Sequence, residues 1–327
     1  MRSTFSIPER AVLPLAVFTF CLIWSSAFSV AKLALYDCPP LLLLTARFLL
    51  AAAITLGAAA FYADWRRLAG RDVAALAALG VLNYALYLGL NCVGMLSISA
   101  GLSALIVSAN PVLTALLAAA FLNERMTWRK AWGLLLGVGG VAFVVGSRVN
   151  AGLSSSVGIA FTLGALLSLV IGTILFKRLT PGGSLWLGNG VQNLAGGLAI
   201  APFAFAFERV GDIVPSTRFF LALAYSVVLV SIVAYLLWFH ILKVSGATVA
   251  SSYHFLMPPL GILFGWLLLG EHVELVDIIG ILPVALGIYF VTRPAQRSST
   301  TRLHIIKAGR GLTVIDDRIE CPSGKVS

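Results

Sequence analysis

Charged side chains are scarce in this chain, and their scarcity excludes most protein classes. Asp, Glu, Lys and Arg make up 11% of its 327 residues, whereas hydrophobic residues make up 59%. Soluble domains carry roughly 25% charged residues, because polar groups must cover their surface. The composition therefore excludes a soluble enzyme, a disordered chain and a nucleic-acid-binding protein, and it leaves a protein that crosses a membrane several times.

Cysteine and catalytic motifs are also sparse. The four cysteines show no CxxC spacing, so we expect neither a metal site nor a redox pair. The sequence contains no Walker loop, no HExxH motif and no nucleophile elbow. We therefore expect no catalytic residue, no cofactor and no bound metal, and we do not expect transport driven by ATP.

The few charges divide the chain into long uncharged runs. These runs are continuously apolar instead of alternating, and unpaired backbone groups are costly in lipid, so the pattern predicts helices and not barrel strands. A membrane-spanning helix takes roughly 20 apolar residues. The fold class is therefore an all-α polytopic membrane protein. Its ten predicted spans cover residues 11–35, 40–62, 73–96, 100–122, 129–147, 156–176, 184–207, 217–242, 247–270 and 275–292.

Positive side chains are concentrated in alternate loops. If the N-terminus lies in the cytoplasm, the inner segments carry 13 Lys and Arg before the tail is counted, and the outer segments carry four. Cytoplasmic loops are enriched in Lys and Arg. The asymmetry predicts that both termini are cytoplasmic, which requires an even number of spans and so favours ten over nine. The polar residues from about 295 onward are predicted to form a cytoplasmic tail, either as a small hairpin or without order.

The two halves of the chain match each other at a fixed offset. Pro111 is followed 13 residues later by Glu124, and Pro258 is followed 13 residues later by Glu271, so the offset is 147. Two halves of five spans each insert in opposite orientations, and in transporters of this design the substrate site lies between the halves. The predicted domains are two repeats and a tail, over residues 1–148, 149–294 and 295–327.

These motifs resemble the ten-helix EamA-type transporters of the drug/metabolite transporter superfamily. The resemblance rests on Pro40 with Arg47-Phe48, on Ala109-Asn110-Pro111 leading to Asn123-Glu124-Arg125, and on Met257-Pro258-Pro259 leading to Gly270-Glu271. Gln192 departs from the pattern, because it stands where the first half has Arg47. Within the superfamily the chain looks most similar to the YddG-type bacterial exporters of aromatic amino acids. The resemblance covers residues 11–292 and implies export through a central cavity, lined mainly by the first, third, fourth, sixth, eighth and ninth spans.

Polar and aromatic side chains inside the apolar runs are the candidates for the cavity wall. Tyr84, Tyr87 and Asn91 fall on one helical stripe, which would be wasted against lipid, so we favour the cavity over an interfacial belt. For Asn110 an inter-helix hydrogen bond is an equal alternative. Aromatic walls with amides and hydroxyls suit an amphipathic substrate with a flat apolar body. The predicted substrate-binding residues are Trp24, Ser25, Asn83, Tyr84, Tyr87, Asn91, Asn110, Tyr235, Trp238, Tyr253 and His254.

Five further residues are predicted to gate or shape the cavity. Pro111 and Pro258 interrupt helices and can expose carbonyl groups. For Arg47 we favour a structural or gating role, because long cations near helix ends reach out to the interface, and direct substrate contact is the alternative. Glu124 is expected at the inner face and Glu271 at the outer face, as gate contacts or, equally, as solvated helix ends.

No aspartate or glutamate lies deep in any predicted span, so the usual carboxylate relay for proton coupling is missing. This absence favours facilitated diffusion. The sequence thus predicts a monomeric transporter in the bacterial inner membrane, which binds a small molecule and exports aromatic or other apolar amino acids and related metabolites by alternating access. The alternatives are a proton-coupled drug or metabolite exporter, with His240 or His254 as proton carrier, and a membrane enzyme for lipid-like substrates. The dispersed aspartates argue against the enzyme.

Overall fold

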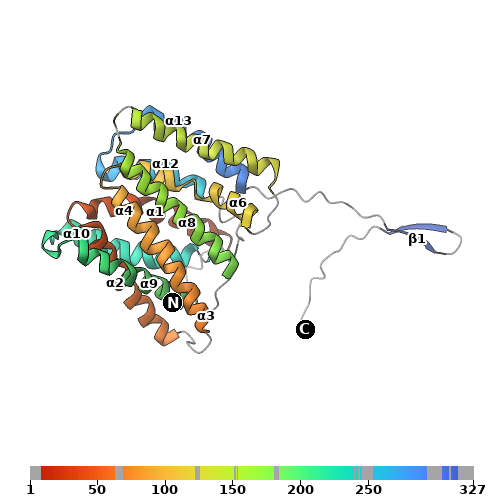
Figure 1. The fold of residues 1–327 in the computed structure, drawn as a ribbon. Coiled ribbons are helices and arrows are strands. Elements are labelled where there is room, and N and C mark those ends of the chain that lie inside the picture. The colour runs from red at the N-terminus through yellow and green to blue at the C-terminus, as the bar shows by residue number, and fades with distance from the viewer. Residues whose placement is uncertain are drawn as a thin grey trace, which may run out of the picture. The chain divides into compact units, whose positions relative to one another are not determined.

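The computed structural model describes residues 9–62, 69–121, 126–150, 152, 154–179, 184–238, 240–241, 244, 253–292, 304–308 and 311–315. The apolar runs fold into a bundle of helices (Figure 1). In chain order the elements are α1 (Glu9–Leu35), α2 (Pro40–Tyr62), α3 (Gly70–Gly80), η2 (Val81–Leu86), α4 (Tyr87–Gly94), α5 (Ala100–Val107), α6 (Asn110–Phe121), α7 (Trp128–Asn150), α8 (Ser156–Leu179), α9 (Leu185–Phe207), η3 (Val210–Asp212), α10 (Thr217–Tyr225), η4 (Ser226–Ala234), η5 (Tyr253–Leu256), α12 (Met257–Leu269) and α13 (Leu275–Thr292).

Eight segments in the described part of the chain are long and apolar enough to cross a membrane. Five are single helices, namely α1, α2, α7, α8 and α9, and three are runs of consecutive elements: α3 to α4, α5 with α6, and α10 with η4 and the residues up to Trp238. They coincide with the first eight predicted spans to within a few residues. Of the other two apolar helices, α13 coincides with the tenth predicted span, and α12 forms the second part of the ninth. The beginning of the ninth predicted span lies outside the described residues.

Two of the spanning segments change from α-helix to π-helix at equivalent places. The π-helical segment η2 begins at Val81 and the π-helical segment η4 begins at Ser226, which is 145 residues later. The π-helix is rare in proteins, and where it occurs it is often found at a functional site. The same distortion therefore recurs in both halves of the chain, at nearly the offset by which the two halves match in sequence.

Glycines let equivalent helices of the two halves pack closely. The helix α2 lies along α9, and α7 lies along α13 (Figure 1). A Cβ atom placed on Gly287 of α13 would lie 2.5 Å from the backbone nitrogen of Gly137 in α7, so only glycine fits there. The hydrophobic effect does not drive helices together inside a bilayer, so their association depends on close van der Waals packing, which small residues at the contact allow.

The helix that contains Pro111 is interrupted just before it. The helix α5 ends at Val107, Ser108 and Ala109 form a turn, and α6 begins at Asn110. Proline lacks an N–H group and its ring clashes with the carbonyl four residues earlier, which accounts for the break. Pro258 is the second residue of α12 and follows the 3-10 turn η5, so this helix also changes geometry next to its proline.

All elements described in the unit Met1–Arg293 are helical, in agreement with the all-α fold class, whereas the tail contains a pair of short strands. The strands β1 (His304–Ala308) and β2 (Gly311–Ile315) pair antiparallel, with His304 opposite Ile315 and Ala308 opposite Gly311. They belong to a separate unit, Pro294–Ser327. Of the two alternatives for the tail, the structure shows the hairpin.

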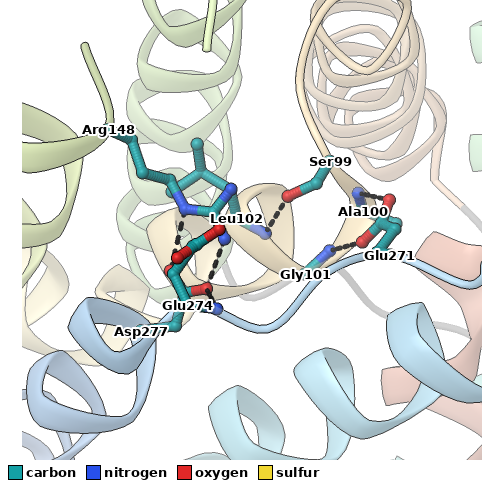
Figure 2. Close-up of polar contacts among 8 residues, drawn as sticks. All are labelled: Ser99, Ala100, Gly101, Leu102, Arg148, Glu271, Glu274 and Asp277. Carbon is teal, nitrogen blue, oxygen red and sulfur yellow. Dashed lines mark hydrogen bonds and ion pairs between the residues drawn. The ribbon is translucent and has the colours of Figure 1, made fainter. Parts of the chain in front are cut away.

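An ion pair joins α7 to α13. Arg148 donates from Nε to Asp277 Oδ1 at 2.8 Å and from Nη2 to Asp277 Oδ2, and Asp277 Oδ2 also accepts from the backbone N–H of Glu274 at 3.0 Å (Figure 2). Asp277 is 2% exposed and Arg148 is 7% exposed. The two charges are taken out of water together, so each depends on the other.

Substitution of one partner is expected to destabilise the bundle more than substitution of both. Asp277→Asn leaves the Arg148 guanidinium buried without a counter-charge, which should lower the free energy of unfolding by about 3–5 kcal/mol. The double variant Arg148→Gln with Asp277→Asn should recover part of that loss. Denaturant unfolding in detergent micelles measures the free energy of unfolding of Arg148→Gln, of Asp277→Asn and of the double variant. A loss in the double variant equal to the sum of the two single losses would contradict the pairing.

Candidate functional site

A cavity lies among α1, α2, α4 and η4. Its wall consists of Trp24, Ala27, Phe28, Ala31, Arg47, Tyr87, Leu88, Asn91, Cys92, Met95, Val230 and Tyr235. Four of the predicted substrate-binding residues therefore line it, namely Trp24, Tyr87, Asn91 and Tyr235. Arg47, for which a structural or gating role was favoured, lines it as well.

The cavity is narrow in this conformation. Its volume is about 40 Å³. One water molecule needs roughly 10–15 Å³ by the same measure, so the space holds a few waters. A molecule with an aromatic ring requires the surrounding helices to move apart before it can enter.

Aromatic rings form a continuous row beside the cavity. Trp24 contacts Phe20 on one side, with ring centroids 5.4 Å apart, and Tyr235 on the other, at 5.7 Å. Tyr235 stacks on Tyr84 at 5.4 Å with an interplanar angle of 22°, and Tyr84 meets Phe48 edge-on at 5.3 Å. Offset and edge-on pairs at these separations are favourable. The row joins α1, α2, η2 and the segment after η4.

The predicted aromatic candidates thus lie together, although not all of them face the cavity. Trp238 stacks on Phe20 at 5.3 Å and extends the row. Tyr84 is fully buried behind the wall. Phe20 and Phe48 were missing from the predicted set, because a phenylalanine in an apolar run gives no sign of whether it meets lipid or protein.

A polar network crosses the interior behind the rings. The Tyr84 hydroxyl donates to Asn189 Oδ1 at 2.9 Å, and Asn189 Nδ2 donates to the backbone carbonyl of Ser231 at 2.8 Å. The Ser231 hydroxyl in turn accepts from Arg47 Nε at 3.0 Å. Asn193 Nδ2 also donates to Asn189 Oδ1, at 2.9 Å. Asn189 and Asn193, one turn apart in the apolar helix α9, were the signal that the sequence offered for this network.

Other predicted residues lie away from the cavity wall. Asn83 points at α8, since a Cβ atom on Gly172 would collide with its amide. Ser25 is fully buried, and its hydroxyl has no partner in the described part of the chain. Asn110 accepts from the hydroxyl of Thr114 in its own helix at 3.1 Å. Tyr253 is half-buried, and its carbonyl accepts from Cys21 Sγ at 3.8 Å.

Two predicted residues cannot be placed in this way. The His254 side chain and the whole of Glu124 lie outside the described residues.

Glu271 closes one end of the bundle by capping a helix of the other half. Its Oε1 accepts from the backbone N–H of Ala100 at 2.6 Å, and its Oε2 accepts from that of Gly101 at 3.0 Å (Figure 2). These N–H groups begin α5 and have no partner within the helix, and the helix dipole favours an anion there. Lys32 of α1 lies 3.7 Å from Glu271 Oε1 and donates to the carbonyl of Ile98. One carboxylate therefore links α1, α5 and α12.

Glu208 repeats the same arrangement at the start of α2. The backbone N–H groups of Leu41 and Leu42 donate to its two carboxylate oxygens at 2.9 and 2.7 Å. Beside it, Asp37 accepts from the Ser216 hydroxyl and from Arg218 Nε, each at 2.7 Å. The Arg218 guanidinium and the Ser216 hydroxyl hold the pKa of Asp37 at about 2, so this carboxylate stays ionised at neutral pH.

Comparison with known proteins shows the family. The EamA-like transporter family matches residues 13–146 and again residues 156–293. The chain is 25% identical to the "Uncharacterized transporter YoaV" of Bacillus subtilis, over 85% of this chain and 96% of that protein. It is 26% identical to the "Probable terminal-alkyne amino-acid exporter" of Streptantibioticus cattleyicolor, over 88% and 94%.

Two further similarities agree with this result. The chain is 28% identical to the "S-adenosylmethionine/S-adenosylhomocysteine transporter" of Chlamydia muridarum, over 79% of this chain and 85% of that protein. One solved crystal structure superposes with a TM-score of 0.61 at 17% identity, over 86% of this chain and 96% of that chain, which shows the fold alone. From the two matches of the family along its length, this chain belongs to the EamA-like transporter family.

Proposed function

We propose that the protein exports aromatic or other apolar amino acids, or related small metabolites, from the bacterial cytoplasm. The observation that carries this proposal is the cavity whose wall combines Trp24, Tyr87 and Tyr235 with the amide of Asn91. Flat apolar walls with few polar groups suit an amphipathic aromatic solute. The name of the Streptantibioticus relative, "Probable terminal-alkyne amino-acid exporter", supports amino acids as the substrate class.

The proposed architecture has ten spans in two inverted repeats, in a monomer with both termini in the cytoplasm. The paired π-helices η2 and η4, and the packing of α2 on α9 and α7 on α13, support a structural equivalence of the halves. In this orientation the Glu271 cap lies at the outer face. Breaking it while a matching closure forms at the inner face is the alternating access that we propose.

The proposed transport is facilitated diffusion. Among the described residues, the wall of the cavity contains no aspartate or glutamate that could relay a proton. The substrate would then move down its own gradient, and the proton gradient would not set the final distribution.

Uptake into vesicles tests both the substrate and the coupling. Purified protein in liposomes should equilibrate labelled phenylalanine, tyrosine or tryptophan, whereas empty liposomes should not. Failure to move any of the three would contradict the amino-acid proposal. A pH gradient across the same vesicles should leave the endpoint unchanged, and a shifted endpoint would replace facilitated diffusion with proton coupling.

The Glu271 closure predicts which glycines matter for transport. A Cβ atom on Gly265 would lie 2.5 Å from Glu271 Oε2, so Gly265→Ala should disturb the cap, as should Glu271→Gln. Hydrogen bonds to charged groups contribute about 1.5–3 kcal/mol each. Loss of one from the cap should therefore lower the population of the state that is closed at the outer face roughly tenfold or more relative to the state that is open there. We expect exchange of labelled substrate to become severalfold slower.

Gly139→Ala is the matched control, because nothing lies within 4 Å of a Cβ atom at that position of α7. It should exchange substrate at the rate of the unmodified protein. The melting temperature of each variant is measured in detergent to confirm folding. If Gly265→Ala and Glu271→Gln fold and exchange as fast as Gly139→Ala, the cap has no part in gating.

A further inference from the structure

Four charged side chains are buried in the described part of the chain: Asp37, Arg47, Arg148 and Asp277. Arg148 and Asp277 pair with each other, and Asp37 pairs with Arg218. For Arg47, which is 5% exposed, no carboxylate lies within ion-pair distance among the described residues. A buried charge without a counter-charge is costly, and in membrane helices it usually marks a functional position.

The guanidinium of Arg47 is held in place by its neighbours, but they use only one of its nitrogen atoms as a hydrogen-bond donor. Nε donates to the Ser231 hydroxyl at 3.0 Å, and the guanidinium carbon lies 5.5 Å from the centre of the Phe48 ring. The hydrogen bond from Nε is the one that Arg47 makes to a described residue, so none is made there by its two terminal NH₂ groups. Arg47 also lines the cavity, so these groups remain for a molecule that enters.

The rest of the wall adds hydrogen-bond donors and no negative charge. Arg47 is the one charged residue among those that line the cavity within the described chain. The Oδ1 atom of Asn91 accepts from the Ser103 hydroxyl at 2.8 Å, which leaves the amide NH₂ of Asn91 as a donor. The hydroxyl of Tyr87 can also donate. The cavity is therefore complementary to an anion.

The second half does not supply a matching charge. Gln192 stands at the position equivalent to Arg47, and its Nε2 donates to the carbonyl of Gly188 in its own helix at 3.2 Å. Among the described residues that line it, the cavity thus has one cation and no carboxylate. The carboxylate of a bound zwitterion has a charged partner in Arg47, whereas its ammonium group has none.

We propose that Arg47 binds the carboxylate of the transported molecule, and that the cavity accepts aromatic monocarboxylates that lack an amino group as well as aromatic amino acids. A guanidinium can hold a carboxylate through two parallel hydrogen bonds, and this pairing is strong where water is excluded. The aromatic row then receives the ring of the same molecule. This inference rests on the proposed function and narrows its substrate class, so an aromatic acid without an amino group should bind at least as well as the amino acid.

The test compares 3-phenylpropanoate with 3-phenylpropanamide, which differ in charge but hardly in shape. Each is measured as a competitor of labelled phenylalanine in vesicles and as a stabiliser of the purified protein against heat in detergent. The concentration of 3-phenylpropanoate that gives half of the full effect should be at least tenfold lower than that of 3-phenylpropanamide. It should also not exceed the corresponding concentration of unlabelled phenylalanine. Equal effects of acid and amide in both measurements would overturn the inference, and phenylalanine uptake would still stand on its own.

Variants at Arg47 separate recognition from architecture. Arg47→Gln should bring the ratio of acid to amide close to one, and Arg47→Lys should keep part of it, because the charge remains without the bidentate geometry. If Arg47→Gln weakens acid and amide by the same factor, the residue is structural and the inference fails. If Arg47→Gln does not fold, the ratio in the unmodified protein still decides.

The thermal measurement also distinguishes this inference from the proposed function. Stabilisation by the acid without any uptake of phenylalanine would support the carboxylate site and contradict amino-acid transport. Uptake of phenylalanine with no preference for the acid would do the reverse.

Discussion

Burying a charge in an apolar bundle is costly unless a partner offsets it, and apart from Arg47 the buried charges of the described residues have charged partners within the chain. Asp277 meets Arg148, Asp37 meets Arg218, and Glu271 satisfies the first N–H groups of α5 while Lys32 lies beside it. Each of these contacts joins segments that are distant in sequence. Electrostatic pairing therefore fixes how the helix ends meet, while glycine contacts fix how closely the helix shafts approach.

The positions of the helices could be predicted from the sequence, because lipid imposes a length and a composition on any segment that crosses it. The partners of the polar side chains could not, since they depend on which helices cross and at what angle. Tyr235 stood out as an aromatic in an apolar run and lines the cavity. Glu208 gave no comparable sign, because a glutamate at the end of an apolar run looks like an ordinary solvated charge. Its role as a cap appears only when α2 is placed beside it.

The likeness of the two halves ends at the centre of the molecule. The helix packing, the π-turns and the break before Pro111 determine the shape of the helices, and features of this kind can be the same in both halves. Arg47 and Gln192 occupy equivalent positions but have different chemistry. The two halves thus keep the same helix shapes, whereas the difference between Arg47 and Gln192 places a positive charge on one side of the cavity only.

The π-turns of η2 and η4 have a further geometric consequence. A π-turn holds one residue more than an α-turn, so the helix carries a local surplus of chain. If that surplus moves by one turn along the axis, the side chains it passes rotate by roughly 100° while the backbone remains hydrogen-bonded within the helix. Val230 of η4 lines the cavity, and Tyr84 of η2 lies directly behind its wall. The wall of the cavity can therefore change which side chains it presents without unwinding either helix in lipid.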